Sequence, residues 1–122
     1  MTPLSLIQKQ LDAYNVQNLD AFMACYADDV IITGDDGRAA LEGKAAVRAR
    51  YADVFARFPE NHAVLMGRLH IGPYVIDSEM VTGRGDKPLY VVCKYTVRDG
   101  LIRRAEFMTE APRGFEAAVG WR

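Results

Sequence analysis

Residues 15–30, NVQNLDAFMACYADDV, join two helices to the first strand of the chain. Asn18 is a favourable N-cap for a second helix that begins directly after the first one ends. The apolar residues that follow recur at helical spacing, at Leu19, Phe22, Met23 and Tyr26. An Asp-Asp pair then precedes the short apolar strand Val30–Thr33. Two helices in this order bend the chain back on itself, which predicts that they cover a sheet formed later.

The rest of the chain extends this pattern to an α+β domain. Pro3 suits the first turn of a helix capped by Thr2, and Pro59 ends a third helix that begins after Gly43. Alternating strands are then expected at 62–71, 74–82, 89–98 and 101–110, and Asp99-Gly100 is a preferred type I′ hairpin turn. The expected order is α-α-β-α-β-β-β-β, an α+β domain with helices on one face of a mostly antiparallel sheet.

Composition narrows the functional class. The 122 residues suit a single domain, 1–122, with a C-terminal extension at 111–122. A net charge of −1 predicts no nucleic-acid or membrane partner. The N-terminus lacks a secretory pattern, and Cys25 and Cys93 lie in apolar segments, so we expect a cytoplasmic protein with reduced thiols. Two His and two Cys without close spacing predict no metal site, and no cofactor is expected.

A two-residue turn at Asp99-Gly100 predicts the register of the last hairpin and therefore its two faces. One face would carry Tyr90, Val92, Lys94, Thr96, Arg103, Ala105 and Phe107. Both faces are half apolar, and helices can cover only one of them. The outer face is therefore expected to meet a second copy of the chain in a homodimer.

The preceding hairpin brings charges to the same face. If its loop is symmetric about Gly85-Asp86, Lys94 lies opposite Asp77, and Glu79 is two residues further along that strand. Two carboxylates and an amine on one apolar face could form a proton shuttle, because each charge shifts the pKa of the others. The alternative is a purely structural ion pair.

The chain resembles the nuclear transport factor 2-like superfamily, and within it the ketosteroid-isomerase-like and SnoaL-like members. The resemblance is carried by residues 11–22 (LDAYNVQNLDAF), 26–30 (YADDV), 41–44 (LEGK) and 95–102 (YTVRDGLI), and it extends from about Leu4 to Glu110. It implies a cone-shaped fold with a small-molecule pocket. It does not imply one activity, because the superfamily contains isomerases, dehydratases, cyclases, hydrolases and binders.

The isomerase members use a strand-end Asp as base and a Tyr and a protonated Asp as oxyanion donors. Carried over by position, the base falls on Gly34, with Asp35 next to it, and the oxyanion Asp falls on Lys94. The Tyr position falls near Gln10, one turn before Tyr14. The resemblance therefore implies the pocket without that catalytic set, and Asp35 stays a candidate base or a turn residue.

The remaining candidates are ligand contacts. Aromatic residues on the helix faces could form the pocket wall or simply the core, and these are Tyr14, Tyr26, Tyr51 and Phe55. His62 could reach the site with a pKa suited to proton transfer, although a lone His is more often structural. Tyr90, Val92 and Phe107 belong to the expected pocket face. Arg84-Gly85-Asp86 is interpreted as turn composition.

Two functions remain open. The first is a small enzyme of the isomerase, cyclase or hydratase type acting on an apolar carbonyl compound, with Asp77, Glu79, Lys94 or Asp35 in catalysis. The second is a non-catalytic ligand-binding dimer, whose buried polar groups would all be paired with one another. A protein-interaction module ranks last, because no further apolar patch is evident.

Overall fold

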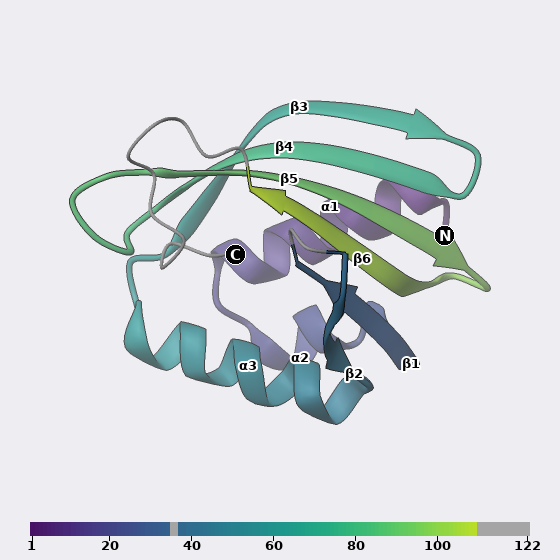
Figure 1. Ribbon diagram of the computed structural model, residues 1–122, viewed down its shortest axis with the longest axis horizontal. Helices are drawn as coiled ribbons and strands as arrows, with labels where there is room; N and C mark the ends of the chain where they lie inside the picture. Colours follow the sequence, from purple (N-terminus) through teal and green to yellow (C-terminus); the bar gives the residue numbers. More distant parts are fainter. Residues whose placement is uncertain (35–36, 110–122) are drawn as a thin grey trace.

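The computed structural model describes residues 1–34 and 37–109 and is shown in Figure 1. Its elements run, in chain order, α1 (Pro3–Asn15), α2 (Leu19–Met23), β1 (Tyr26–Thr33), β2 (Ala39–Glu42), α3 (Lys44–Arg57), β3 (His62–Ile71), β4 (Tyr74–Thr82), β5 (Leu89–Arg98) and β6 (Leu101–Thr109). Within this described part of the chain, no helix is long and apolar enough to cross a membrane. Asp35 and the extension expected at 111–122 lie outside the described residues.

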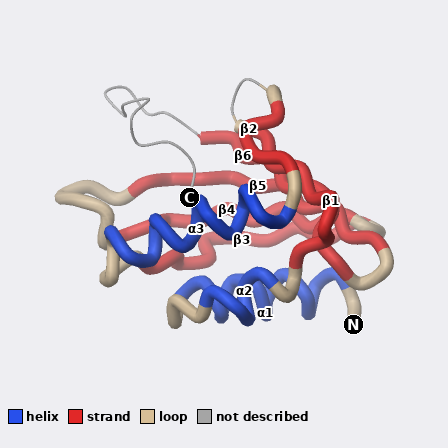
Figure 2. Tube along the Cα trace, turned by 90° about the horizontal axis from the view of Figure 1, so that it is seen from below, coloured by secondary structure: helices blue, strands red, loops and turns tan. Residues whose placement is uncertain are grey.

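The strands form a six-stranded sheet in the order β2-β1-β6-β5-β4-β3. Neighbours are antiparallel except β1 and β6, which run parallel. The helices lie together on one side of this curved sheet, as Figures 1 and 2 show. There α1 packs against β3 and β4, whereas α3 packs against β1 and β2. The expected α+β cone is confirmed, and β2 is an additional strand where a loop was predicted.

Local capping signals are confirmed. The Thr2 side chain accepts a hydrogen bond from the Ser5 amide, and Asn18 accepts one from the Ala21 amide. These bonds satisfy amides that a helix start otherwise leaves without partners. Asp99 and Gly100 both have positive φ, as a type I′ turn requires.

The core between the helices and the sheet is aromatic. The Phe22 ring lies 4.7 Å from Tyr51 and 5.0 Å from Tyr26, measured between ring centroids, and Tyr14 lies 5.5 Å from Phe55. All five side chains are buried. Tilted and edge-to-face contacts of this kind stabilise a core beyond simple area burial. These rings therefore fill the space under the sheet.

The second helix is shorter than predicted. It ends at Met23, and β1 begins at Tyr26, whose helical spacing from Phe22 suggested one more turn. Tyr26 instead pairs with Ile102 in the parallel ladder, and the Cys25 carbonyl accepts a hydrogen bond from the Ile102 amide. Tyr26 is therefore part of a strand, although its spacing from Phe22 also fits a helix, and its side chain still points into the core.

The predicted registers of β5 are wrong by one residue on both sides. Against β4, Asp77 pairs with Cys93 and Ile76 pairs with Lys94. The β4–β5 loop is therefore centred on Gly85, whereas the prediction placed its centre between Gly85 and Asp86. Against β6, Arg98 pairs with Leu101 as predicted, but a bulge near Arg103 shifts every later pair. Because side chains alternate, a one-residue shift exchanges the two faces.

Gly83 holds the β4–β5 loop against the segment that follows α3. Its φ is +86°, and a Cβ placed on it would lie 2.0 Å from the Glu60 carbonyl oxygen. Only glycine combines that backbone conformation with so close an approach. This contact therefore fixes the position of the next residue, Arg84.

Substituting Gly83→Ala should lower the free energy of unfolding by about 3 kcal/mol, because left-handed strain and steric overlap act together. Gly100→Ala is the matched control, since it has φ +74° and no described atom within 4 Å of its Cβ position. That control should lose only about 1 kcal/mol. Urea unfolding measures both losses, and equal losses would mean that the close contact is not needed.

Candidate functional site

Two carboxylates lie inside the cone on β4. Asp77 and Glu79 face the helices and are 0% and 1% exposed. Arg68 of β3 donates from Nε and Nη2 to the two Asp77 oxygens, at 2.6 and 2.9 Å, and from Nη1 to Gln8 of α1 at 2.7 Å. A buried carboxylate needs such a fork of donors to offset its lost hydration. Asp77 is therefore held by a bidentate ion pair with Arg68.

The contact with Asp77 also changes the pKa of Arg68. The hydrogen bond to Asp77 raises the pKa of the Arg68 guanidinium, burial opposes that rise, and the charges of Asp77, Tyr95 and Glu79 add to it. Arg68 thus stays a cation beside both acids. Among residues 1–34 and 37–109, no group of His, Cys, Asp and Glu could hold a metal ion.

Lys94 does not join the acids, which corrects the predicted cluster. The register of β5 turns Lys94 to the outer face, opposite Ile76 and Glu106. Its Nζ lies 3.9 Å from the Glu106 carboxylate and 4.7 Å from the centroid of the Tyr74 ring. An amine there cannot act on a ligand held under the sheet.

The other residues predicted as ligand contacts also lie partly on the inner face of the sheet and partly outside it. Phe107 is buried on the inner face, where Tyr14, Tyr26, Tyr51 and Phe55 form the aromatic core. Tyr90 and Val92 lie on the outer face, because their partners are Met80 and Ser78. His62 is exposed at the start of β3.

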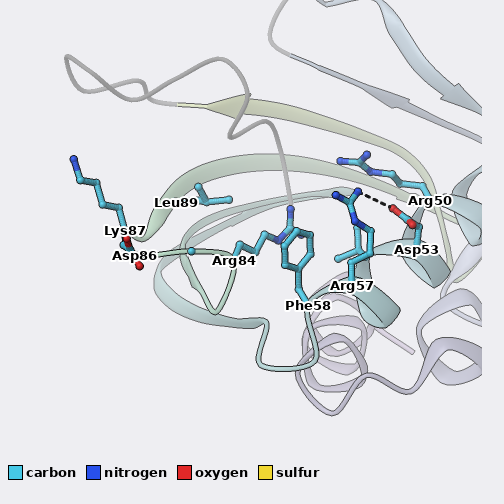
Figure 3. Close-up of a pocket in the computed structure, with 10 residues that line it drawn as sticks. Arg50, Asp53, Arg57, Phe58, Arg84, Asp86, Lys87 and Leu89 are labelled. Carbon is cyan, nitrogen blue, oxygen red and sulfur yellow. Dashed lines mark hydrogen bonds and ion pairs between the residues drawn. The ribbon is translucent and has the colours of Figure 1, made fainter.

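A pocket of about 540 Å³ lies between α3 and the β4–β5 loop. Figure 3 shows its wall, in which α3 and its C-cap supply one side and the loop the other. The lining residues are Arg50, Asp53, Val54, Arg57, Phe58, Arg84, Gly85, Asp86, Lys87 and Leu89. The volume is typical of small-molecule sites. Within the described residues, the wall therefore carries four cations and two acids.

Arg84 connects this pocket to the core. It donates from Nε to the Asn61 side-chain oxygen and from Nη2 to the Tyr14 hydroxyl, both at 3.0 Å. Its guanidinium also lies 5.6 Å from the centroid of the Phe58 ring. The tripeptide interpreted as turn composition thus contains a structural cation.

The β4–β5 ladder relates the buried acids to the pocket. Leu89 lines the pocket and pairs with Val81, and the next inward-facing pair is Glu79 with Val91. Two residues along a strand span about 7 Å. Glu79 is therefore one such step from the pocket wall, and Asp77 is two steps away.

Sequence reasoning missed the pocket and Arg68. One signal was present, because residues 50, 53, 54 and 57 recur at helical spacing and so share one face of α3. The contribution of Arg84 and Asn61 carried no comparable signal, since it depends on loop geometry.

Comparisons with known proteins agree with the fold. A sequence model of the SnoaL-like domain matches residues 7–105. A search of the curated proteins finds no match. An uncharacterised cystatin-fold protein from Novosphingobium aromaticivorans is 30% identical with a TM-score of 0.82, and the match covers 88% of this chain and 98% of that one.

Two further solved structures carry functional descriptions. A candidate ketosteroid isomerase from Kribbella flavida is 25% identical with a TM-score of 0.75, covering 92% of this chain and 83% of its own. A candidate polyketide cyclase from Sinorhizobium meliloti is 20% identical with a TM-score of 0.75, covering 88% and 100% respectively. The match of the SnoaL-like model over residues 7–105 shows that the chain belongs to the SnoaL-like domain family.

Proposed function

We propose that this protein binds a small, largely apolar carbonyl compound in the pocket and acts on it as a cofactor-free isomerase, cyclase or hydratase. The observation that carries the proposal is Glu79, a carboxylate 1% exposed inside an apolar cone and one inward-facing step from the pocket wall. Moving a carboxylate into such surroundings is costly, so its presence favours a chemical role. The candidate enzymes among the similar structures support this class of function.

In this proposal Glu79 is the general base. It would remove a proton next to the carbonyl of a ligand that extends past Leu89 onto the inner face of the sheet, and return it at another position, which keeps atoms and charge balanced. Arg84 lines the pocket and donates a hydrogen bond to the Tyr14 hydroxyl at 3.0 Å. From this position Arg84 can stabilise negative charge that develops on a nearby ligand oxygen. Asp77 acts as a positioning residue, because its bond to Arg68 holds that cation beside both acids.

Proton abstraction can be measured without knowing the natural substrate. With 2-tetralone in D2O, the protein should accelerate exchange of the α-protons, followed by NMR. Glu79→Gln should lower the exchange rate by about 100-fold or more, with little change in 2-tetralone affinity. Glu42→Gln, an exposed carboxylate on β2, is the matched control and should exchange at the wild-type rate.

The outcomes separate the candidates. Binding of 2-tetralone without accelerated exchange would favour a non-catalytic ligand-binding protein, the alternative supported by the paired state of Asp77. Exchange that survives Glu79→Gln but is lost in Asp77→Asn would move the base to Asp77.

We also propose that the protein forms a homodimer through the outer face of its sheet. Apolar side chains gather there from β3 to β6, namely Val64, Leu69, Ile71, Tyr74, Ile76, Met80, Tyr90, Val92 and Met108. Leu69 and Ile71 are 55% and 62% exposed. A contiguous apolar face of this kind is typical of an interaction surface, and a sheet face paired with its own copy gives a closed, two-fold dimer.

Sedimentation equilibrium tests the dimer. The wild-type protein should sediment as a dimer, and Leu69→Asp should weaken association by about tenfold or more, because it places a charge in an apolar contact. Val16→Asp, at a residue 74% exposed beyond the end of α1, is the control and should leave association unchanged. A wild-type monomer at high protein concentration would contradict the proposal.

A further inference from the structure

Leu89 lies at the boundary between the pocket and the buried acids. It is the first residue of β5, it lines the pocket, and it pairs with Val81 of β4. The next inward-facing pair along the same two strands is Glu79 with Val91. The way from the pocket to Glu79 along the inner face therefore runs directly past the Leu89 side chain.

Apolar side chains fill the space beyond Leu89. Val81 and Val91 are 0% and 2% exposed, and neither is among the residues that line the pocket. Leu89 itself is 5% exposed. Closely packed side chains leave little free volume between them, so a ligand that extends past this point must fit against the leucine. The size of the side chain at position 89 thus limits the shape of the ligand.

The position of Leu89 is set from two sides. Its backbone belongs to the β4–β5 ladder, and the loop before it is held where Gly83 meets the Glu60 carbonyl. On the α3 side of the pocket, the C-cap residue Phe58 supplies a second apolar surface (Figure 3). Side chains on a fixed backbone discriminate between ligands more sharply than side chains on a mobile one. Leu89 and Phe58 therefore bound the pocket with surfaces of defined position.

We propose that Leu89 is the specificity-determining residue of this site, because it limits branching next to the carbonyl group of the ligand. A flat ring can extend past the leucine, whereas methyl groups beside the carbonyl would collide with it. In an apolar site, one methylene too many changes discrimination by about tenfold or more. This inference rests on the pocket of the proposed function, and it names the substrate class as flat ketones without branching beside the carbonyl.

A pair of ketones tests the limit directly. 1,1-Dimethyl-2-tetralone differs from 2-tetralone only by two methyl groups beside the carbonyl. Isothermal titration of the wild-type protein should give at least about tenfold tighter binding of 2-tetralone. Burial of two added methyl groups would by itself strengthen binding of the dimethyl compound. A preference for 2-tetralone therefore reports the steric limit and not the apolar character of the ligands.

Variants assign the preference to Leu89. Leu89→Ala should strengthen binding of the dimethyl compound by about tenfold or more and should leave 2-tetralone binding little changed. Leu89→Val removes less volume and should give an intermediate ratio of the two affinities, which also covers the case that Leu89→Ala does not fold. Leu6→Ala is the matched control, because this leucine of α1 is 3% exposed and does not line the pocket. It should lose stability like Leu89→Ala but keep the wild-type ratio.

The inference would be overturned by wild-type binding of the dimethyl compound as tight as that of 2-tetralone. A ratio that Leu89→Ala and Leu89→Val leave unchanged, or one that Leu6→Ala alters equally, would also overturn it. The proposed function would survive these results, since it is read from proton exchange and from Glu79→Gln. Conversely, a preference that depends on Leu89 would stand even if Glu79→Gln left exchange unaltered. A wild-type protein that does not bind 2-tetralone would overturn both proposals.

Discussion

The contact between the β4–β5 loop and the segment after α3 is the constraint on which the pocket depends. Gly83 brings the loop backbone against the Glu60 carbonyl, and Arg84 then reaches Asn61 and the Tyr14 hydroxyl. The loop is thereby joined both to α1 and to the segment between α3 and β3. Without this contact, Arg84 and Leu89 would have no fixed relation to the arginines of α3, and the wall would not enclose a ligand.

A second constraint applies to the charged side chains inside the cone, Arg68, Asp77 and Glu79. An ion inside an aromatic core must be paired, and a bidentate bond from Arg68 meets that need for Asp77. Glu79 lies on the same face of β4, near enough to contribute to the raised pKa of Arg68. One cation thus serves two acids.

The sequence predicted the helices, the hairpin turn and the family resemblance because these depend on local signals. Thr2, Asn18 and Asp99-Gly100 each act within a few residues of themselves. The pairing of β5 with β6 was wrong from Thr96 onward because the bulge near Arg103 has no local signal, and one extra residue exchanges inside and outside. Lys94 was assigned to the acids for a separate reason, because the β4–β5 loop was assumed to be symmetric about Gly85-Asp86. The loop is centred half a residue earlier, and Arg68 of β3 is the residue that pairs with Asp77.

The distribution of charge gives the pocket a direction. Arginines stand at the side of α3 and at the loop, and the carboxylates of Asp77 and Glu79 lie further along the inner face. A ligand in the pocket would meet the arginines at one end and the inner face that carries Glu79 at the other. In the proposed function the carbonyl end of the ligand would lie toward Glu79, because a base must come within hydrogen-bond reach of the proton that it removes. The contact that places Arg84 in the pocket wall would thus also set which end of the ligand faces the candidate base.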